Sequence, residues 1–210
     1  MLPDLQSAYR AHHSTETAIL RVLSDILSAL DSGNLVMLTL LDLSAAFDCV
    51  DHHTLLQRLR TSYGLGEVIS WFTSYLSGRT KQVRTATSSS MPSAVDFGVP
   101  QGSVLGPILF LLYTADLLQL VKRHHLTLHV YADDTQIYGH CQPSNAGGLA
   151  QRVVVCIGEI PSWMKANRLQ LNLAKTDVLW CASSRRQHLV PTASVRVTYA
   201  HNARRQSDDC

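Results

Sequence analysis

The sequence predicts an α+β fold in which helices pack on one face of a sheet. Apolar segments of strand length occur at residues 35–41 and 126–131, and apolar residues at helical spacing occur at 14–31 and 103–121. This mixture of strands and helices is typical of an α+β sheet covered by helices on one face. A length of 210 residues fits one domain, or one domain with a ragged end, since domains contain roughly 100–200 residues.

The composition indicates a folded protein, since 46% of the residues are apolar and 16% are charged. A net charge of +2 does not by itself indicate a nucleic-acid partner, so any such binding must depend on local features. The chain contains five cysteines without metal-site spacing. These cysteines indicate reduced thiols and an intracellular location, with nothing to distinguish nucleus from cytoplasm.

No membrane span is expected. The N-terminus lacks the apolar core of a signal peptide. The most apolar stretch, residues 104–113, contains ten residues, whereas a membrane helix needs about 20. This stretch is therefore predicted to belong to a buried core helix.

The first half of the chain predicts three helices and two strands. Residues 14–31 begin with the capping signal Ser-Thr-Glu-Thr and end in turn residues, which predicts a helix. The run LVMLTLL at 35–41 predicts a strand that is buried on both faces. A short helix follows Asp51, whose side chain is expected to cap it. A further helix is expected at 67–77, and a strand at 81–85.

The central segment predicts one long helix and a hairpin. Residues 103–121 are expected to form a single buried helix. Strands are expected at 126–131 and 135–138, on either side of a tight turn. The apolar face of the long helix is predicted to contain Leu105, Ile108, Leu109, Leu112 and Leu117.

The last part of the chain predicts one more helix and two more strands. Residues 149–165 have helical spacing despite Pro161. Two strands are expected at 169–173 and 178–181. From residue 183 the pattern fades into polar residues, so the remainder is expected to be an irregular, disordered tail.

Three carboxylates stand where predicted strands end. Asp42 follows the first strand, and Asp133 and Asp134 occupy the hairpin turn. Adjacent carboxylates repel each other, so the turn is either fully solvated or neutralised by a cation. A solvated turn is the simpler interpretation of two adjacent aspartates alone. If neighbouring strands bring all three together, their hard oxygen atoms suit Mg²⁺, and two ions about 4 Å apart would support phosphoryl transfer.

Four sequence motifs favour the metal-site interpretation over a solvated turn. They occur in the order LLDLSAAFDCVDHHTLLQRL (40–59), FGVPQGSVLGPILFLLYTADL (97–117), VYADDTQIY (130–138) and NRLQLNLAKTDVLW (167–180). Together they resemble the reverse transcriptases of non-LTR retrotransposons, of the long interspersed element type. The resemblance covers roughly residues 5–185, and the chain resembles a truncated copy of such an enzyme.

The resemblance implies a polymerase palm, in which an antiparallel sheet carries the catalytic residues. It implies a remnant of the fingers or a connecting helix at 1–34, the palm at 35–182, an irregular tail at 183–210, and no thumb. The implied activity is RNA-directed DNA polymerisation by two-metal nucleotidyl transfer. The implied cofactors are two Mg²⁺ ions, with Mn²⁺ possible, and the implied partners are an RNA template, a DNA primer and deoxynucleoside triphosphates.

The resemblance also implies roles for acidic and basic residues. Asp42, Asp133 and Asp134 correspond to the metal ligands of the family. Lys175 corresponds to a lysine near the leaving pyrophosphate, where it could act as general acid, although a solvated loop lysine remains an alternative. Asp48 matches an acidic position of the first motif and is expected to support the local turn rather than to bind metal.

Three further residues are implied to contact nucleotide or template. Phe47 corresponds to an aromatic residue that packs under the sugar and excludes a 2′-hydroxyl, since a clash can reject an added group. A core phenylalanine is the alternative. Gln101 is implied to contact the incoming nucleotide, and Gly102 to let the template strand lie close.

Two other functions share some of these features. A truncated remnant without catalytic activity, which at most binds nucleic acid, would keep every motif. A metal-dependent nuclease or phosphatase could use the same aspartates, but it needs neither Phe47 nor the Gly-Val-Pro-Gln-Gly loop at 98–102. The sequence therefore favours a reverse transcriptase palm, active or decayed, and leaves the oligomeric state open.

Overall fold

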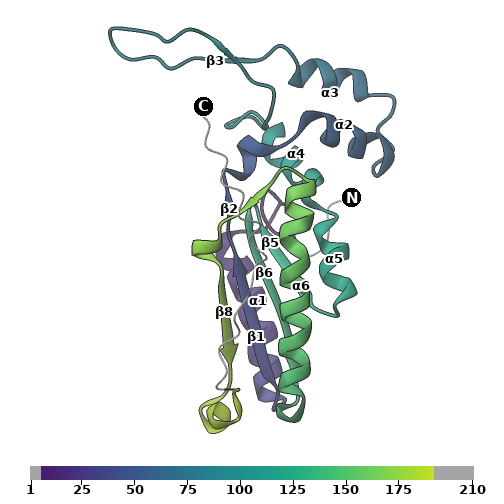
Figure 1. Cartoon of the computed structure of the whole chain (residues 1–210), viewed down its shortest axis with the longest axis vertical. Helices are drawn as coiled ribbons and strands as arrows, with labels where there is room; N and C mark the ends of the chain where they lie inside the picture. The colour runs from purple at the N-terminus through teal and green to yellow at the C-terminus, as the bar shows by residue number, and fades with distance from the viewer. Residues whose placement is uncertain (1–5, 192–210) are drawn as a thin grey trace, which may run out of the picture.

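The structure is a computed structural model that describes residues 6–191. A four-stranded antiparallel sheet forms its centre, in the order β5 (Thr127–Tyr131), β6 (Asp134–Cys141), β1 (Leu35–Leu41) and β8 (Asp177–Cys181). The strands run along the long axis of the molecule (Figure 1). The predicted α+β class and antiparallel sheet are therefore confirmed, and β1 covers the residues predicted for it.

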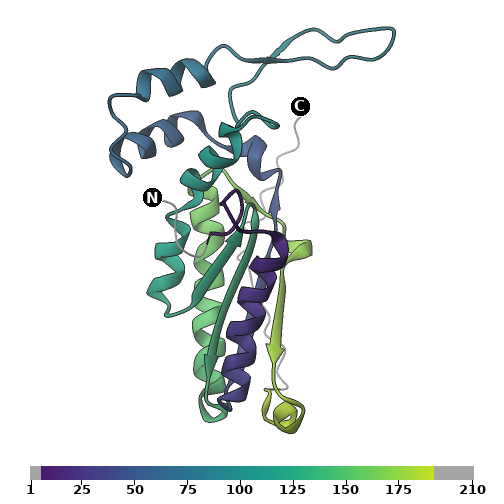
Figure 2. The same ribbon diagram turned by 180° about the vertical axis from the view of Figure 1, so that it is seen from behind.

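Helices cover both faces of this sheet, whereas the sequence predicted one. α6 (Ala146–Ala166) lies on one face and α1 (Thr15–Asp31) on the other, as opposite views show (Figures 1 and 2). Within β1, Met37 packs in the main core cluster with residues of α6, whereas Val36 packs with Val22 of α1. Successive side chains of a strand point to opposite faces, so a strand that is apolar at nearly every position needs cover on both sides.

The capping signal before α1 acts as predicted. Ser14 Oγ accepts a hydrogen bond from the Thr17 amide at 3.2 Å, and the Thr17 hydroxyl oxygen accepts one from the Ser14 amide at 2.8 Å. This reciprocal pair is a capping box in which threonine replaces the usual glutamate or glutamine. The helix stops before Gly33, whose φ of 85° is favoured by glycine.

An arm made of residues 52–97 projects from one end of the sheet (Figure 1). It begins with α2 (His52–Thr61), which Asp51 caps as predicted by accepting a hydrogen bond from the Thr54 amide at 2.8 Å. α3 (Ile69–Leu76) follows within the range predicted for it. The arm then continues into an extended hairpin.

Strand pairing in this hairpin is shorter than predicted. β3 (Thr80–Lys81) and β4 (Ser93–Ala94) pair over two residues, whereas the sequence predicts a strand at 81–85. Every residue from 80 to 94 is exposed. A longer ladder would therefore have no buried face to stabilise it.

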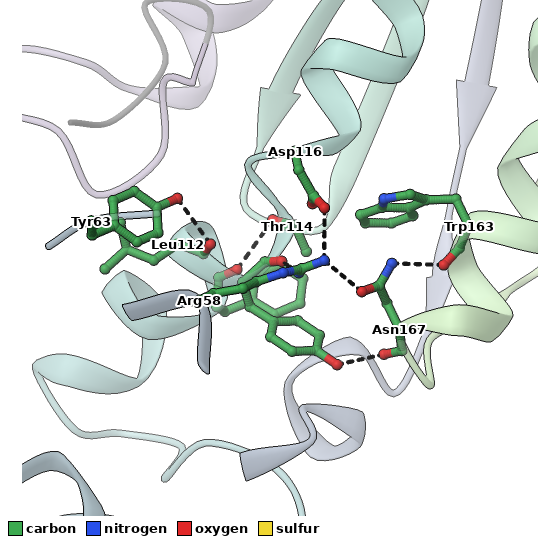
Figure 3. Close-up of polar contacts among 9 residues, drawn as sticks. Arg58, Tyr63, Leu112, Thr114, Asp116, Trp163 and Asn167 are labelled. Atoms are coloured by element: carbon green, nitrogen blue, oxygen red, sulfur yellow. Dashed lines mark hydrogen bonds and ion pairs between the residues drawn. The ribbon is translucent and has the colours of Figure 1, made fainter. Parts of the chain in front are cut away.

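The apolar segment at 103–121 forms two helices, so the prediction of a single helix is wrong. α4 (Leu105–Thr114) and α5 (Leu117–Arg123) are separated at Ala115 and Asp116. At the start of α5, the Leu118 and Gln119 amides donate to the carbonyls of Ala115 and Asp116, three residues earlier, which tightens the turn. Asp116 points to an arginine of α2 at this place (Figure 3), a long-range contact that apolar spacing does not reveal.

The buried face of these two helices also differs from the prediction. Leu109 and Leu117 are buried as expected, but Ile108 is 36% exposed. Among the described residues, the stretch 105–123 has the length and composition of a membrane span. Its buried side chains nevertheless pack in the main core cluster, as the sequence predicted for a core helix. Buried positions outside the predicted face include Phe110, Leu111, Tyr113, Leu120 and Val121.

The C-terminal part of the described chain returns to the sheet. β7 (Gln170–Leu171) pairs with β2 (Leu43–Ser44) beside the central sheet, and β8 follows. Residues 184–189 form a 3₁₀ helix within the tail that was predicted to be irregular. The rest of that tail, 192–210, and residues 1–5 of the predicted fingers remnant lie outside the described residues.

Arg58 of α2 joins the arm to the sheet and its helices. Its guanidinium donates hydrogen bonds to the Tyr113 carbonyl and to Asn167 Oδ1, the latter at 2.6 Å. It also lies 2.7 Å from Asp116 Oδ2 (Figure 3). The Tyr113 hydroxyl donates to the Asn167 carbonyl at 2.6 Å. These four residues, from α2, α4, the α4–α5 break and the end of α6, form the Arg58 junction.

Candidate active site

Asp42 follows β1 where β1 leaves its pairing with β6. The last paired residues are Leu41 and Thr135, so one further step brings Asp42 opposite Asp134. Residues directly opposite each other in an antiparallel pair lie about 4.5–5.5 Å apart at their Cα atoms. The predicted meeting of Asp42 with the hairpin turn on adjacent strands is therefore confirmed.

The other two carboxylates belong to the hairpin between β5 and β6. Tyr131 pairs with Asp134, which leaves Ala132 and Asp133 as the two turn residues. Ala132 has a φ of 58°, and turns that match the twist of a hairpin need a positive φ at this position. This tight turn presents both carboxylates at the end of the sheet that Asp42 occupies.

Negative charge accumulates at this end of the sheet. Burial raises the pKa of the Asp134 carboxyl above its ordinary value, and the carboxylates of Asp133 and Asp42 raise it further. Lys175 opposes this effect, and its ammonium lies 3.6 Å from Asp42 Oδ2. Because the negative charge is only partly compensated, an added cation would be stabilised here.

Asn172 is a site residue that the sequence analysis missed. Its side-chain amide donates a hydrogen bond to Asp42 Oδ2 at 2.9 Å, and its backbone amide donates to the Asp42 carbonyl at 2.9 Å. These bonds attach Asp42 to the segment that carries Lys175. An asparagine near a turn usually forms a hydrogen bond to the backbone of a nearby residue. The sequence around Asn172 therefore suggested a partner close in the chain and gave no sign of Asp42, which lies 130 positions away.

The oxygen donors of this site suit a hard divalent cation. Carboxylates are typical ligands of Mg²⁺, and burial together with the neighbouring carboxylates of Asp133 and Asp42 raises the pKa of Asp134. As the side chains stand, no three Asp, Glu, His or Cys residues within 6–191 are grouped to hold one ion, and Asp42 contacts Lys175 instead. The type and charge of the donors thus fit Mg²⁺, although their present grouping is not a ligand set.

Two loops bring together the residues predicted to contact nucleotide. The Phe47 carbonyl accepts a hydrogen bond from the Val99 amide at 2.9 Å. The Gln101 side-chain amide donates to Asp48 Oδ1 at 3.0 Å. Phe47 and Gln101 therefore lie on adjoining loops, and Asp48 orients Gln101 in addition to any role in its own turn.

Phe47 is partly a core residue and partly exposed. Its ring stacks on Phe110 of α4, with the ring centroids 4.5 Å apart and the planes inclined by 29°. Phe110 is fully buried, whereas Phe47 is half-buried. The core therefore supports the ring of Phe47 and leaves part of its surface available.

Gly98, rather than Gly102, makes the close backbone approach within the chain. Gly98 has a φ of 88°, and a Cβ added there would lie 3.0 Å from the Cα and the carbonyl oxygen of Asp48. Gly102 has a φ of 76° and nothing within 4 Å of such a Cβ. Both conformations favour glycine, while the surface at Gly102 stays open to a ligand.

Comparison with known proteins identifies the family. The family model described as "Reverse transcriptase (RNA-dependent DNA polymerase)" matches residues 1–199. The chain belongs to the reverse transcriptase family. The resemblance inferred from the four motifs is thereby confirmed.

Retrotransposon reverse transcriptases are similar to this chain. The probable RNA-directed DNA polymerase from transposon BS of Drosophila melanogaster is 33% identical over 184 residues, which cover 84% of this chain and 20% of the relative. The RNA-directed DNA polymerase from mobile element jockey of Drosophila funebris is 30% identical over 141 residues, 65% of this chain and 15% of that protein. The chain therefore spans about a fifth or less of the length of these curated relatives.

Solved structures show the same fold. Apo telomerase from Candida tropicalis, truncated from its C-terminal domain, superposes with a TM-score of 0.63 at 18% identity and covers 81% of this chain and 36% of that one. Telomerase from Candida albicans in complex with the TWJ fragment of telomeric RNA has a TM-score of 0.59 at 16% identity, over 80% of this chain and 30% of that one. The predicted palm-type fold of a reverse transcriptase is thus confirmed.

Proposed function

We propose that this chain is the palm of an RNA-directed DNA polymerase and that it supports two-metal nucleotidyl transfer. The observation that carries the proposal is the meeting of Asp42 with the Asp133-Asp134 turn at one end of the sheet. Membership of the reverse transcriptase family supports the same chemistry. The proposed substrates are an RNA template, a DNA primer and deoxynucleoside triphosphates.

In this proposal the carboxylates hold the metal. Asp42, Asp133 and Asp134 would hold two Mg²⁺ ions, or Mn²⁺ in their place, and such ions would supply charge stabilisation during phosphoryl transfer. Asn172 keeps Asp42 oriented through its two hydrogen bonds. Lys175 lies beside Asp42, where it can donate a proton to the leaving pyrophosphate.

The adjoining loops hold the nucleotide. Phe47 packs under the sugar, and its stack on Phe110 keeps the ring from yielding to a 2′-hydroxyl. Gln101, oriented by Asp48, contacts the incoming nucleotide. The open surface at Gly102 accepts the template strand. The proposal includes an intracellular location, which the unpaired cysteines of the described chain support (Cys49, Cys141, Cys156 and Cys181).

A protein that binds nucleic acid without catalysis is the second candidate. The observation in its favour is that Asp42 contacts Lys175 and that, within residues 6–191, the carboxylates are not grouped to hold one ion as the side chains stand. A polymerase must hold primer and triphosphate as well as metal. A palm that binds nucleic acid and metal, but cannot extend a primer, would fit this second function.

The first test measures metal binding and primer extension on the purified 210-residue chain. Mn²⁺ binding is followed by the loss of the free-ion electron paramagnetic resonance signal, and extension is measured in Mg²⁺ on an RNA template with a DNA primer. Asp42→Asn and Asp134→Asn should each weaken Mn²⁺ binding by more than about tenfold, since even changes around metal ligands typically cost 10–100-fold. Extension should fall to background in both variants.

The control is Asp31→Asn, which removes an exposed carboxylate at the end of α1, close to where β1 starts rather than where it ends. This variant should bind Mn²⁺ and extend primers as the parent does. Metal binding by the parent without extension would favour the second candidate. Equal Mn²⁺ binding by the parent and both site variants would exclude the carboxylate cluster as the metal site.

A further inference from the structure

Backbone hydrogen bonds join the segment that carries Phe47 to the loop that carries Gln101. The Val99 amide donates to the Phe47 carbonyl at 2.9 Å, and the Gly98 amide donates to the Val50 carbonyl at 2.8 Å. Gly98 and Val99 are both buried, and Gln101 follows them closely in the chain. The placement of Gln101 relative to Phe47 therefore depends on how firmly this connection is held.

The side chain of His52 adds a third hydrogen bond to the connection. Its ring Nε2 lies 2.7 Å from the Gly98 carbonyl oxygen. A carbonyl oxygen only accepts hydrogen bonds, so Nε2 carries the hydrogen here. Gly98 is thus bonded through both its amide and its carbonyl. His52 is the first residue of α2, directly after the cap Asp51, so a capped helix sets where its ring stands.

His52 is the side chain best placed to fix the conformation of Gly98. The φ of 88° at Gly98 is one that glycine adopts readily among many others, so bonds from outside the loop must hold it. Gln101 also bonds to Asp48, but this contact is exposed and water can replace it. The bond from His52 is partly buried and ends on a buried residue, where an unpaired carbonyl is costly.

We propose that His52 is a positioning residue for the incoming nucleotide and that it sets the discrimination between deoxyribose and ribose. This inference rests on the proposed function for the identity of the ligand. A clash with the ring of Phe47 rejects a 2′-hydroxyl only if the nucleotide cannot shift away from the ring. Gln101 holds the nucleotide from the adjoining loop, and His52 holds that loop. Without the bond from His52 the loop yields, and the two sugars are accepted more equally.

Three substitutions at His52 separate the loss of the hydrogen bond from the loss of the ring. His52→Leu removes the donor. His52→Asn keeps a carboxamide, but its nitrogen is one bond nearer to the backbone than Nε2 and does not reach Gly98. His52→Gln places its amide nitrogen as many bonds from the backbone as Nε2, so it can donate to the same carbonyl. The matched control is His53→Leu, at the next and exposed position of α2.

The first measurement is amide hydrogen exchange, followed residue by residue by NMR on the full chain in chelator. The Gly98 and Val99 amides should exchange about tenfold faster in His52→Leu and His52→Asn, because a buried carbonyl without its donor weakens the closed loop. They should exchange as in the parent in His52→Gln and in the control. Unchanged exchange in α6 shows that the fold is intact. Exchange at the parent rate in both the Leu and Asn variants would overturn the proposal.

The second measurement compares the two sugars. The deoxyribose and ribose forms of a fluorescent 2-aminopurine nucleoside triphosphate are bound to the full chain in Mg²⁺ without primer, so that no turnover occurs. The parent should bind the deoxy form more tightly. The ratio of the two dissociation constants should fall several-fold in His52→Leu and His52→Asn, since small misplacements are costly, and should return to the parent ratio in His52→Gln. The control His53→Leu should also keep that ratio.

A purely structural role of His52 at the start of α2 predicts a different result. Both triphosphates would then bind more weakly by the same factor, and an unchanged ratio of this kind would contradict the proposal. Mn²⁺ binding should match the parent in every His52 variant, because the ring bonds to the Gly98 loop rather than to the carboxylates. A parent that bound neither triphosphate would instead exclude the proposed function, and with it the ligand assigned to this loop.

Discussion

Asp134 holds a charge that its surroundings disfavour. Burial and the two neighbouring carboxylates raise the pKa of its carboxyl, and the Lys175 ammonium compensates only in part. An acid whose pKa is raised by folding binds protons more tightly in the folded state. Its contribution to stability is therefore most favourable at low pH and declines as pH rises through the folded-state pKa.

Asp134→Asn should accordingly stabilise the metal-free fold at neutral pH. The gain should be small, up to about 0.5 kcal/mol, because the carboxyl is only partly desolvated and Asp134 as a whole residue is open to solvent, which screens its interactions. It should vanish as the pH falls below the ordinary range of an aspartate. Urea unfolding in chelator at pH 7 and pH 3.5 measures this difference. A destabilisation at pH 7 would show that Asp134 is a structural acceptor rather than an uncompensated charge.

Single residues could be predicted where their signal was local. Asp51 and Ser14 were recognised as helix caps because both bond within three residues. Asn172 and Arg58 were missed because their partners lie far away in the sequence. Such contacts exist only after the sheet and helices have packed.

At the scale of elements, α6 is a helix that contains a residue disfavouring helix. It runs without interruption from Ala146 to Ala166, although Pro161 lies inside it. Proline lacks an amide hydrogen, so the Ile157 carbonyl loses its partner four residues later. The helix persists because its inner face is fully buried against the sheet, including Val153, Ile157 and Ile160.

Pro161→Ala should therefore stabilise the protein, by about 1–3 kcal/mol, because it restores one hydrogen bond and removes the clash of the ring. Guanidinium unfolding monitored by circular dichroism provides the measurement. The matched control is Ser162→Ala at the next, exposed position, for which about 0.5 kcal/mol or less is expected. An unchanged or lower midpoint for Pro161→Ala would indicate that the ring contributes more by packing than it costs in the helix.

Helices and strands, like single residues, were predictable where their sequence signal was local. The strand at 35–41 was located correctly because a continuous apolar run is a local pattern. The break at Ala115 and Asp116 was not, because apolar spacing continues across it while Asp116 bonds to α2. The hairpin of the arm was overestimated, since the sequence does not reveal that its strands lack a core to pack on.

At the scale of the molecule, an elongated sheet with its covering helices carries the arm at one end (Figures 1 and 2). The Arg58 junction lies where the two parts meet (Figure 3). The Arg58 side chain is 16% exposed and interacts with α4, Asp116 and the end of α6. Its position therefore joins α2 of the arm to α4, to the α4–α5 break and to the end of the helix that covers the sheet.

Arg58→Met should destabilise the whole fold by about 2–3 kcal/mol, because buried acceptors lose a charged donor. Arg60→Met, at an exposed position of the same helix, should change stability by less than about 0.5 kcal/mol. Urea unfolding followed by tryptophan fluorescence and by circular dichroism measures both. If Arg58→Met produced a separate early transition, the arm would be an independent unit and the junction would not couple it to the sheet.

The order of strands in the sheet also has a consequence for how the protein is made. β1 is synthesised early, but the two strands that pair with it, β6 and β8, are synthesised much later. Leu35 therefore cannot pair until Cys141 has been synthesised, and Val36 cannot pair with β8 until Cys181 has been synthesised. Pairing between segments so distant in the chain is slow, because the entropy of closing the loop is lost before contacts compensate it. Asp42 first meets the hairpin carboxylates and only later gains Asn172 and Lys175. The carboxylate end of the sheet is thus completed once the chain has been synthesised past Lys175, and the pairing of Val36 with Cys181 at the opposite end of β1 follows it.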